Sequence, residues 1–352
     1  MPLRLLAALG VGLAYVVFLT IDQSHWWRLK PDYAFGWLVP VFVVFLVSER
    51  WPRLQEIARS AGSSRLPGWL KNIVWFAAAA ALAGGLLLFV LGAIYRAGAG
   101  STQPGSLILA CGHAGVLLGM IYFNVPPGSL ADSTHSSPWQ ALRYDAQLRA
   151  VALFVFPAFI WILSAPLLTA VENAISIALL QKVVATVFAV FSMLGFPLVQ
   201  EGNVLVLPLG TVGVAEACSG IRSLTGCLFA GSFLAAICFN RLWQKFALVA
   251  AALGLAYFTN LLRSLFLTAW AYAYGSEAIE GSLHDLTGYA VLGLTVLLLL
   301  LLMPLLNPER WRRWLKLDEV STRDEISAEA KIVDDSFHEG TVAEARRKDG
   351  AA

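Results

Sequence analysis

Charged residues are scarce in this sequence. Only 14% of its 352 residues are charged, 58% are hydrophobic, and the formal net charge is +2. So small a positive excess gives no indication of a nucleic-acid partner, which would call for a concentrated basic surface. The basic residues occur in short clusters between apolar runs, where we expect them to set the orientation of membrane segments.

Cysteine and histidine are also few. The four cysteines, Cys111, Cys218, Cys227 and Cys238, form no spaced framework, and three of them lie inside apolar runs. We therefore expect neither a disulfide scaffold nor a zinc site. The five histidines include no HExxH-like pair, which argues against a membrane metalloprotease. No phosphate-cradling glycine loop is present, so no cofactor is expected.

Long apolar runs dominate what is present. The mean hydropathy is +0.69, and several runs reach the roughly 20 residues that a helix needs to cross the hydrocarbon of a bilayer. The predicted fold class is an all-α, polytopic transmembrane helical bundle of about eight spans, the first of them retained because no small-residue cleavage site follows it. The predicted spans are 3–20, 33–48, 72–95, 104–124, 150–169, 219–239, 246–273 and 285–306.

The loops predict an orientation. The loop 49–71 contains five basic residues, whereas the segments 200–217 and 275–284 contain no lysine or arginine. Placing basic loops inside puts both termini in the cytoplasm and these two segments outside. Residues 1–306 then form the integral-membrane domain, and the polar residues 307–352 form a cytoplasmic, largely disordered tail.

Residues 172–199 permit two interpretations. They are apolar enough for a ninth span, but a ninth span would place a basic loop, or the segment 200–217, on the wrong side. Polar residues also interrupt the run. The preferred interpretation is a helix that lies in the outer membrane interface.

The segment "VAEACSGIRSL" combines a carboxylate, a thiol and a guanidinium at the start of an apolar run. Cys218 comes just before a predicted helix, whose unpaired N–H groups stabilise a thiolate. Arg222, one turn further along, could add to this stabilisation, and Glu216 could orient an arginine or form a structural ion pair. An inert apolar thiol is the alternative for Cys218.

Two further polar groups are predicted at the same depth. In "TNLLRS", Asn260 and Arg263 share a helix face, and Arg263 lies about 26 Å above the inner end of its span. His284 lies where the last span begins on the same side, and an unperturbed imidazole can exchange a proton near neutral pH, which suits an acid/base catalyst. Snorkelling of Arg263 and a structural hydrogen bond of His284 are the alternatives.

These residues resemble the exosortase/archaeosortase family of membrane-embedded cysteine transpeptidases. "EACSGIRSL", "NLLRS" and "HDLTGY" resemble the family's nucleophile, arginine and histidine motifs, in the family's order. "YAFGWLVP" at 33–40 resembles a further family run, with Ala34 and Phe35 in place of its usual serine and histidine. Because of that departure, only packing in an interfacial aromatic belt is expected of this stretch.

The resemblance implies that Cys218 is the nucleophile, Arg263 the stabilising cation and His284 the acid/base. Asn260 could position Arg263 or donate to an oxyanion. The implied partners are exported proteins with a C-terminal sorting signal, which comprises a short motif such as Pro-Glu-Pro, a hydrophobic helix and a basic cluster. The other implied partners are membrane lipid and an acceptor nucleophile of unknown identity. The implied location is the bacterial inner membrane, with the site at its extracytoplasmic face.

Two other classes of function stay open. A transporter also places charged residues in its spans, but here they gather at one face and form no chain across the bilayer. A noncatalytic assembly protein for surface polymer export is the second alternative.

Overall fold

The computed structural model describes residues 3–59, 62–64, 66–130, 138–213, 221–239, 241–279 and 281–306. Glu216, Cys218 and the predicted tail 307–352 lie outside these residues. The chain divides into two compact units, residues 1–296 and 297–352, at a boundary inside the last helix. The fold and the candidate site described below belong to the first unit.

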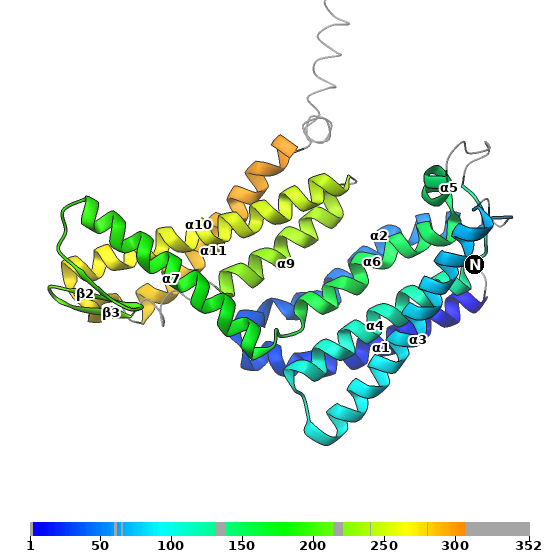
Figure 1. The fold of residues 1–352 in the computed structure, drawn as a ribbon, viewed down its shortest axis with the longest axis horizontal. Coiled ribbons are helices and arrows are strands. Elements are labelled where there is room, and N and C mark those ends of the chain that lie inside the picture. The colour runs from blue at the N-terminus through cyan, green and yellow to red at the C-terminus, as the bar shows by residue number, and fades with distance from the viewer. Residues whose placement is uncertain are drawn as a thin grey trace, which may run out of the picture. The chain divides into compact units, whose positions relative to one another are not determined.

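The described residues are overwhelmingly helical, which confirms the predicted fold class (Figure 1). The helical elements are α1 (Leu3–Leu29), η1 (Pro31–Leu38), α2 (Val39–Arg59), α3 (Gly68–Ala99), α4 (Gln103–Asn124), α5 (Pro138–Tyr144), α6 (Ala146–Ser164), α7 (Thr169–Met193), α9 (Ile221–Cys238), α10 (Leu242–Tyr274), η2 (Ser276–Ile279) and α11 (Ser282–Leu306). By length and composition, nine stretches of the described residues could cross a membrane. The prediction of about eight spans is close to this number.

The helices α1 to α6 pack as one group. α4 lies between α3, α1 and α6, and α2 packs on α6 (Figure 1). The α3–α4 contact depends on glycine: a Cβ on Gly85 would meet the backbone nitrogen of Val116 at 2.6 Å, and one on Gly115 would meet the carbonyl oxygen of Ala81 at 2.6 Å. Small residues allow two helix backbones to approach closely where no hydrophobic effect drives them together.

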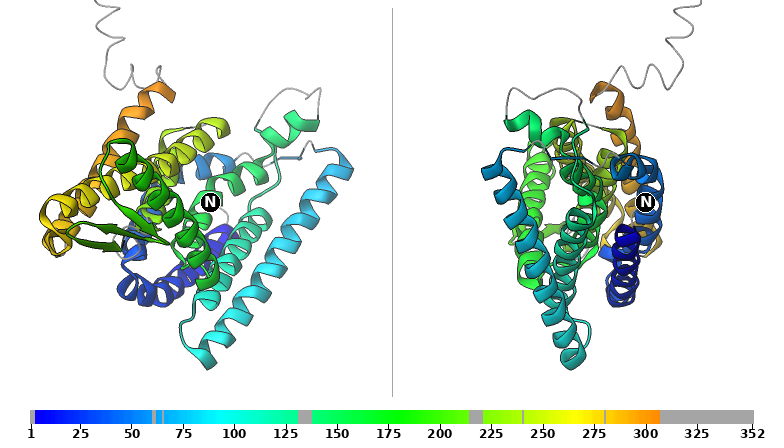
Figure 2. Two further views of the ribbon diagram at one scale, coloured as in Figure 1. Left: turned by 60° about the vertical axis from the view of Figure 1, so that its left-hand side comes forward. Right: turned by 90° about the vertical axis from the view of Figure 1, so that its right-hand side faces the viewer.

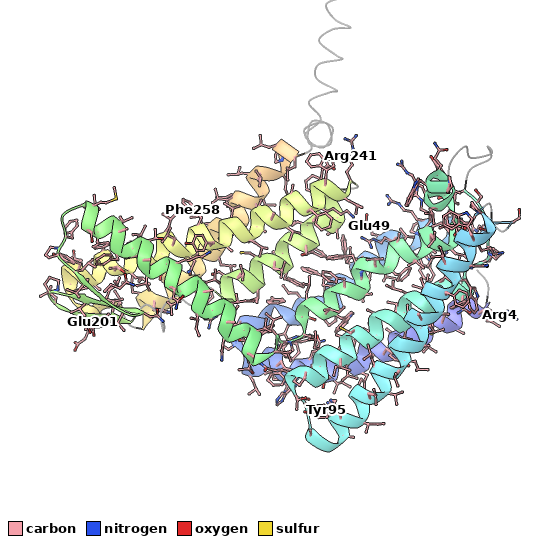
Figure 3. The ribbon with its side chains drawn as sticks, in the orientation of Figure 1. Arg4, Glu49, Tyr95, Glu201, Arg241 and Phe258 are labelled. Atoms are coloured by element: carbon pink, nitrogen blue, oxygen red, sulfur yellow. The ribbon has the colours of Figure 1, made fainter. Side chains whose placement is uncertain are left out.

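The helices α9 and α10 form an antiparallel hairpin. Their contact point is Gly231, where an added Cβ would lie 2.6 Å from the Cβ of Ala252. Figure 3 labels Arg241 at the turn of this hairpin and Phe258 on α10. Phe258 is 51% exposed, as expected for an apolar side chain that faces lipid.

The 3-10 helix η1 connects the two groups. The Thr225 hydroxyl of α9 donates to the carbonyl oxygen of Asp32 over 2.9 Å, and the ring of Phe35 lies 4.6 Å from that of Phe229. One helix later, Phe42 stacks on Phe233 with ring centroids 3.7 Å apart. The stretch "YAFGWLVP" therefore packs α1 and α2 against α9.

A small antiparallel sheet follows α7. Its strands are β1 (Val199–Glu201), β2 (Val204–Leu207) and β3 (Gly210–Gly213), in the order β1-β2-β3. Leu205, Leu207 and Val212 are buried in a cluster with α7 and with Leu267 and Ala271 of α10. The left view of Figure 2 shows the strands from a further side, and Figure 3 labels Glu201 among them. The sequence prediction placed this segment outside the membrane without foreseeing a sheet.

Contacts among the helix ends define one end of the bundle. Asp22 of α1 binds Arg96 of α3 and Ser106 of α4, and Arg222 of α9 binds Asp32 of η1. We call this end, where α1 and α10 end and α4 and α9 begin, the η1 end. The other end, which includes the α9–α10 turn, is the opposite end.

Both ends of α7 lie at the η1 end. Near its start, Glu172 pairs with Lys30 over 2.6 Å; near its finish, Phe191 belongs to the cluster that contains Ala271, one turn from the end of α10. Figure 1 shows α7 running across α9 and α10 rather than alongside them. Although α7 is one of the nine candidate spans by composition, this packing favours the interfacial interpretation and leaves eight elements to cross.

Cysteine labelling will test the position of α7. We expect a cysteine at Met193, which is 87% exposed, to react with a membrane-impermeant maleimide from the same side as one at Ala99, at the η1 end. A cysteine at Leu242, at the opposite end, should label only from the other side. Labelling of Met193→Cys from the side of Leu242→Cys would make α7 a ninth span.

The α3–α4 contact predicts different outcomes for two neighbouring glycines. Gly85→Ala should destabilise the protein by about 1–3 kcal/mol, because its Cβ overlaps the backbone of α4. Gly84→Ala should be neutral or stabilising by up to about 1 kcal/mol, because a Cβ there meets nothing within 4 Å and alanine favours the helix. Thermal unfolding in detergent measures both, and equal melting temperatures for the two variants would contradict the packing argument.

Candidate active site

The position of Arg263 along α10 determines how far it lies from the start of that helix. It follows Leu242, the first residue of α10, by 21 positions, which correspond to about 32 Å at 1.5 Å per residue. This is about the thickness of the hydrocarbon core. The last three turns of α10, up to Tyr274, project about 16 Å further. Arg263 therefore lies about one hydrocarbon thickness from the start of α10.

His284, in the first turn of α11, is the partner of Arg263. The Nη2 atom of Arg263 lies 2.9 Å from the Nε2 atom of His284 and donates to the His284 carbonyl oxygen over 3.0 Å. The Nε atom of Arg263 donates to the Thr287 hydroxyl over 3.4 Å, and that hydroxyl donates to the same carbonyl over 2.9 Å. The two residues predicted to share a depth are thus in direct contact.

Gly288 lies beside the guanidinium. A Cβ at Gly288 would lie 3.6 Å from Nη2 and 3.8 Å from Cζ of Arg263, in ordinary van der Waals contact. The sequence "HDLTGY" therefore provides the imidazole, the hydroxyl and a small residue beside the guanidinium.

The contact determines which ring nitrogen of His284 carries the proton. A guanidinium has donors and no acceptor, so Nε2 of His284 must accept and the proton of the neutral ring must be on Nδ1. The two N–H groups on Nη1 of Arg263 make no hydrogen bond to the described residues. They remain able to bind a negatively charged oxygen.

The register of the α9–α10 hairpin relates this pair to the predicted nucleophile motif. Gly231 opposes Ala252, and moving ten residues from each toward the η1 end leads to Ile221 and Leu262, about 15 Å further along both helices. Arg263 thus lies at the level of the first residue of α9. Cys218 precedes Ile221 by three residues and lies outside the described residues, as does Glu216.

The structure places Arg222 differently from the other candidates. Its Nε atom lies 3.2 Å from the Asp32 carboxylate, and its side chain is 68% exposed. It contacts η1, not Arg263 or His284. The sequence pattern did not single out Asp32, because no periodicity links residues on two elements almost 200 positions apart.

Asn260 lies one turn before Arg263 on α10. It is 3% exposed, and its carbonyl oxygen accepts a hydrogen bond from the Ser264 hydroxyl over 2.9 Å. Its position beneath Arg263 is compatible with the supporting role considered for it.

Neutral polar groups lie deeper between the helices. The hydroxyls of Thr259 and Thr295 are 2.8 Å apart, and the Cys227 thiol faces Thr295. The polar groups described beneath the Arg263–His284 pair are therefore uncharged. Among the described residues, no group of three or more histidine, cysteine or acidic side chains could hold a metal ion.

The comparison with protein families identifies the chain. Residues 26–301 match the family model described as Transmembrane exosortase (Exosortase_EpsH), which spans more than half of the sequence. The chain belongs to the transmembrane exosortase family. No curated protein and no solved structure matches it.

Family membership confirms the resemblance drawn from the three motifs. The match includes η1 and the whole α9–α10 hairpin, as well as Arg263 and His284. In this exosortase, "YAFGWLVP" has the packing role expected for it. Tyr33 is 1% exposed and accepts a hydrogen bond from the Leu167 amide over 2.9 Å, whereas Trp37 is 47% exposed and packs edge-on against Trp27.

Proposed function

We propose that this exosortase is a membrane cysteine protease and transpeptidase. It cleaves the C-terminal sorting signal of exported proteins through a thioester and transfers the new carboxyl end to a surface acceptor. The observation that carries the proposal is the contact between Arg263 and His284 at the level where α9 begins. Family membership supports it independently.

The proposed cycle begins with proton transfer. The Cys218 thiol gives its proton to Nε2 of His284, which releases the hydrogen bond from Arg263. The thiolate attacks the scissile carbonyl carbon, a C–S bond forms, and the carbonyl oxygen becomes an oxyanion. Arg263 stabilises this charge with its Nη1 donors and with the Nη2 donor freed from His284.

Collapse of this intermediate breaks the C–N bond. The imidazolium of His284 protonates the departing amine, which leaves with the hydrophobic tail, and a thioester remains on Cys218. An acceptor nucleophile then gives its proton to His284 and attacks the thioester. Transfer of that proton to the departing thiolate restores the enzyme.

The distribution of cations supports an orientation with the η1 end outside the cell and both termini in the cytoplasm. At the η1 end, Lys30, Arg96 and Arg222 each pair with a carboxylate, and Arg28 donates to the Ser24 hydroxyl. The opposite end carries Arg4, Arg53, Arg59, Lys71, Arg143, Arg149, Arg241 and Lys245. Basic residues accumulate on the cytoplasmic side of bacterial membrane proteins, so the proposed site faces the exported substrate.

In this orientation, the membrane helps to align the substrate with the proposed site. A substrate whose own helix spans the same bilayer presents its scissile bond at a fixed height. Arg263 lies at about that height, about 32 Å along α10. Restricting both partners to one plane lowers the entropy cost of their encounter.

We predict that Cys218→Ala abolishes processing at an unchanged level of membrane protein, because it removes the nucleophile and only a small volume. Cys227→Ala and Cys238→Ala should retain processing. The measurement is the intact mass of a reporter protein that carries a hydrophobic, basic C-terminal signal, in cells with each variant. Normal processing by Cys218→Ala would exclude the cysteine mechanism and favour a transporter or assembly protein.

Arg263→Lys should lower the processing rate at least tenfold, or about 1.4 kcal/mol of transition-state stabilisation. The planar guanidinium binds His284 and Thr287 at once while leaving Nη1 donors free, which one ammonium group cannot reproduce. The matched control is Arg222→Lys, whose exposed pair with Asp32 tolerates a differently shaped cation. Equal rates for Arg263→Lys and the wild type would reduce Arg263 to an interfacial anchor.

A further inference from the structure

The sheet has two edges whose backbone groups can be assigned. β2 and β3 are joined by a two-residue turn, so Leu207 and Gly210 form a hydrogen-bonded pair, and so do Leu205 and Val212. The alternate residues, Thr211 and Gly213, direct their N–H and C=O groups away from β2. At the other edge, Gln200 does the same on β1.

Neither edge is paired within the described residues. The backbone N–H and C=O groups of Thr211, Gly213 and Gln200 that point outward form no hydrogen bond to another described element. Unpaired strand edges are templates for a further strand, which protein domains use to bind extended peptides.

β3 is the strand from which the chain leads on to the proposed active site, whereas β1 is not. β3 starts beside Ser276, where an added Cβ on Gly210 would lie 2.6 Å from the serine hydroxyl, beyond the end of α10. From Gly213 the chain leads to Ile221, at the level of Arg263. Cys218 follows Gly213 by five positions, at most about 18 Å of chain. β1 instead adjoins the end of α7.

The direction of β3 matches that of a membrane-anchored substrate. β3 begins beyond the end of α10 and continues toward the start of α9, so it runs toward the bundle. An exported protein followed by a C-terminal membrane helix also runs toward the membrane just before that helix. The two chains therefore run parallel.

We propose that β3 binds the extended substrate segment before the scissile bond as a fourth, parallel strand of the sheet. This inference rests on the proposed function and names how the substrate is held. The N–H and C=O groups of Thr211 and Gly213 pair with the main chain of the substrate. Because main-chain pairing reads no side chain, one enzyme can hold tails of different sequence at this edge.

Proline at Gly213 tests the pairing. Gly213→Pro removes an outward N–H and leaves the β2–β3 hydrogen bonds intact, because Gly213 does not bond to β2. Gly213→Ala is the matched control: its N–H remains, a Cβ there meets nothing within 4 Å, and the φ of Gly213 is not positive. Gln200→Pro makes the same change at the opposite edge.

With the reporter described above, we expect Gly213→Pro to lower kcat/KM at least tenfold. Gly213→Ala and Gln200→Pro should stay within twofold of the wild type. Alkylation of Cys218 by iodoacetamide, which needs no strand pairing, should be equal in all variants. Equal processing by Gly213→Pro and Gly213→Ala would overturn the proposal.

Disulfide cross-linking provides a second measurement that does not depend on proline. In the full chain with Cys218→Ala, a cysteine at Thr211 is paired with reporters that carry single cysteines at successive positions before the cleavage site. We expect cross-links at alternating positions with Thr211→Cys and none with Gln200→Cys. Absence of cross-links at Thr211, or equal cross-linking at both edges, would contradict strand addition at β3.

Failure of this inference is distinguishable from failure of the proposed function. If the proposed function fails, Cys218→Ala processes the reporter as the wild type does. If only the strand proposal fails, processing depends on Cys218, but Gly213→Pro and Gly213→Ala behave alike.

Discussion

Backbone N–H and C=O groups in hydrocarbon have no water to bond, so each must find its partner within the protein. In this exosortase, the long helices of the bundle form their backbone hydrogen bonds internally. The one described sheet, with its open edges, packs against the last turns of α10. Those turns lie beyond the length that a helix needs to cross a bilayer. Whether water or hydrocarbon surrounds the backbone therefore determines where irregular and extended chain can occur, and hence where an extended peptide can be bound.

The same constraint applies to Arg263. A guanidinium at the hydrocarbon boundary is costly unless its donors are satisfied, and here three of them bind His284 and Thr287. The arrangement also holds the arginine beside the imidazole, and the described residues leave its Nη1 donors unused. One residue can then hold the His284 imidazole in a single tautomer and stabilise negative charge nearby, a combination that would suit the proposed acyl transfer.

The two helix groups meet through η1. This contact gives a short aromatic run, far along the chain from Arg263 and His284, a role in the fold. Asp32 and Phe35 of η1 contact α9 within its first three turns. Lys30 and Tyr33 contact α7 and the chain before it. Because η1 and Lys30 contact α9 as well as α7 and the chain before it, they fix the position at which α9 starts. Residue 218 comes three positions before that start.

Apolar length and the sequence of basic clusters are local properties, so the sequence alone determined the helical class and approximately the number of spans, and it predicted a shared depth for Arg263 and His284. The interfacial character of 172–199 was also inferred from the charges of its flanking loops, and the packing of α7 now favours it. Contacts between elements depend on how each helix is rotated about its axis and where it touches a neighbour, which no single segment encodes. The direct Arg263–His284 bond, the partner of Arg222 at Asp32 and the sheet after α7 were therefore decided only by the tertiary structure.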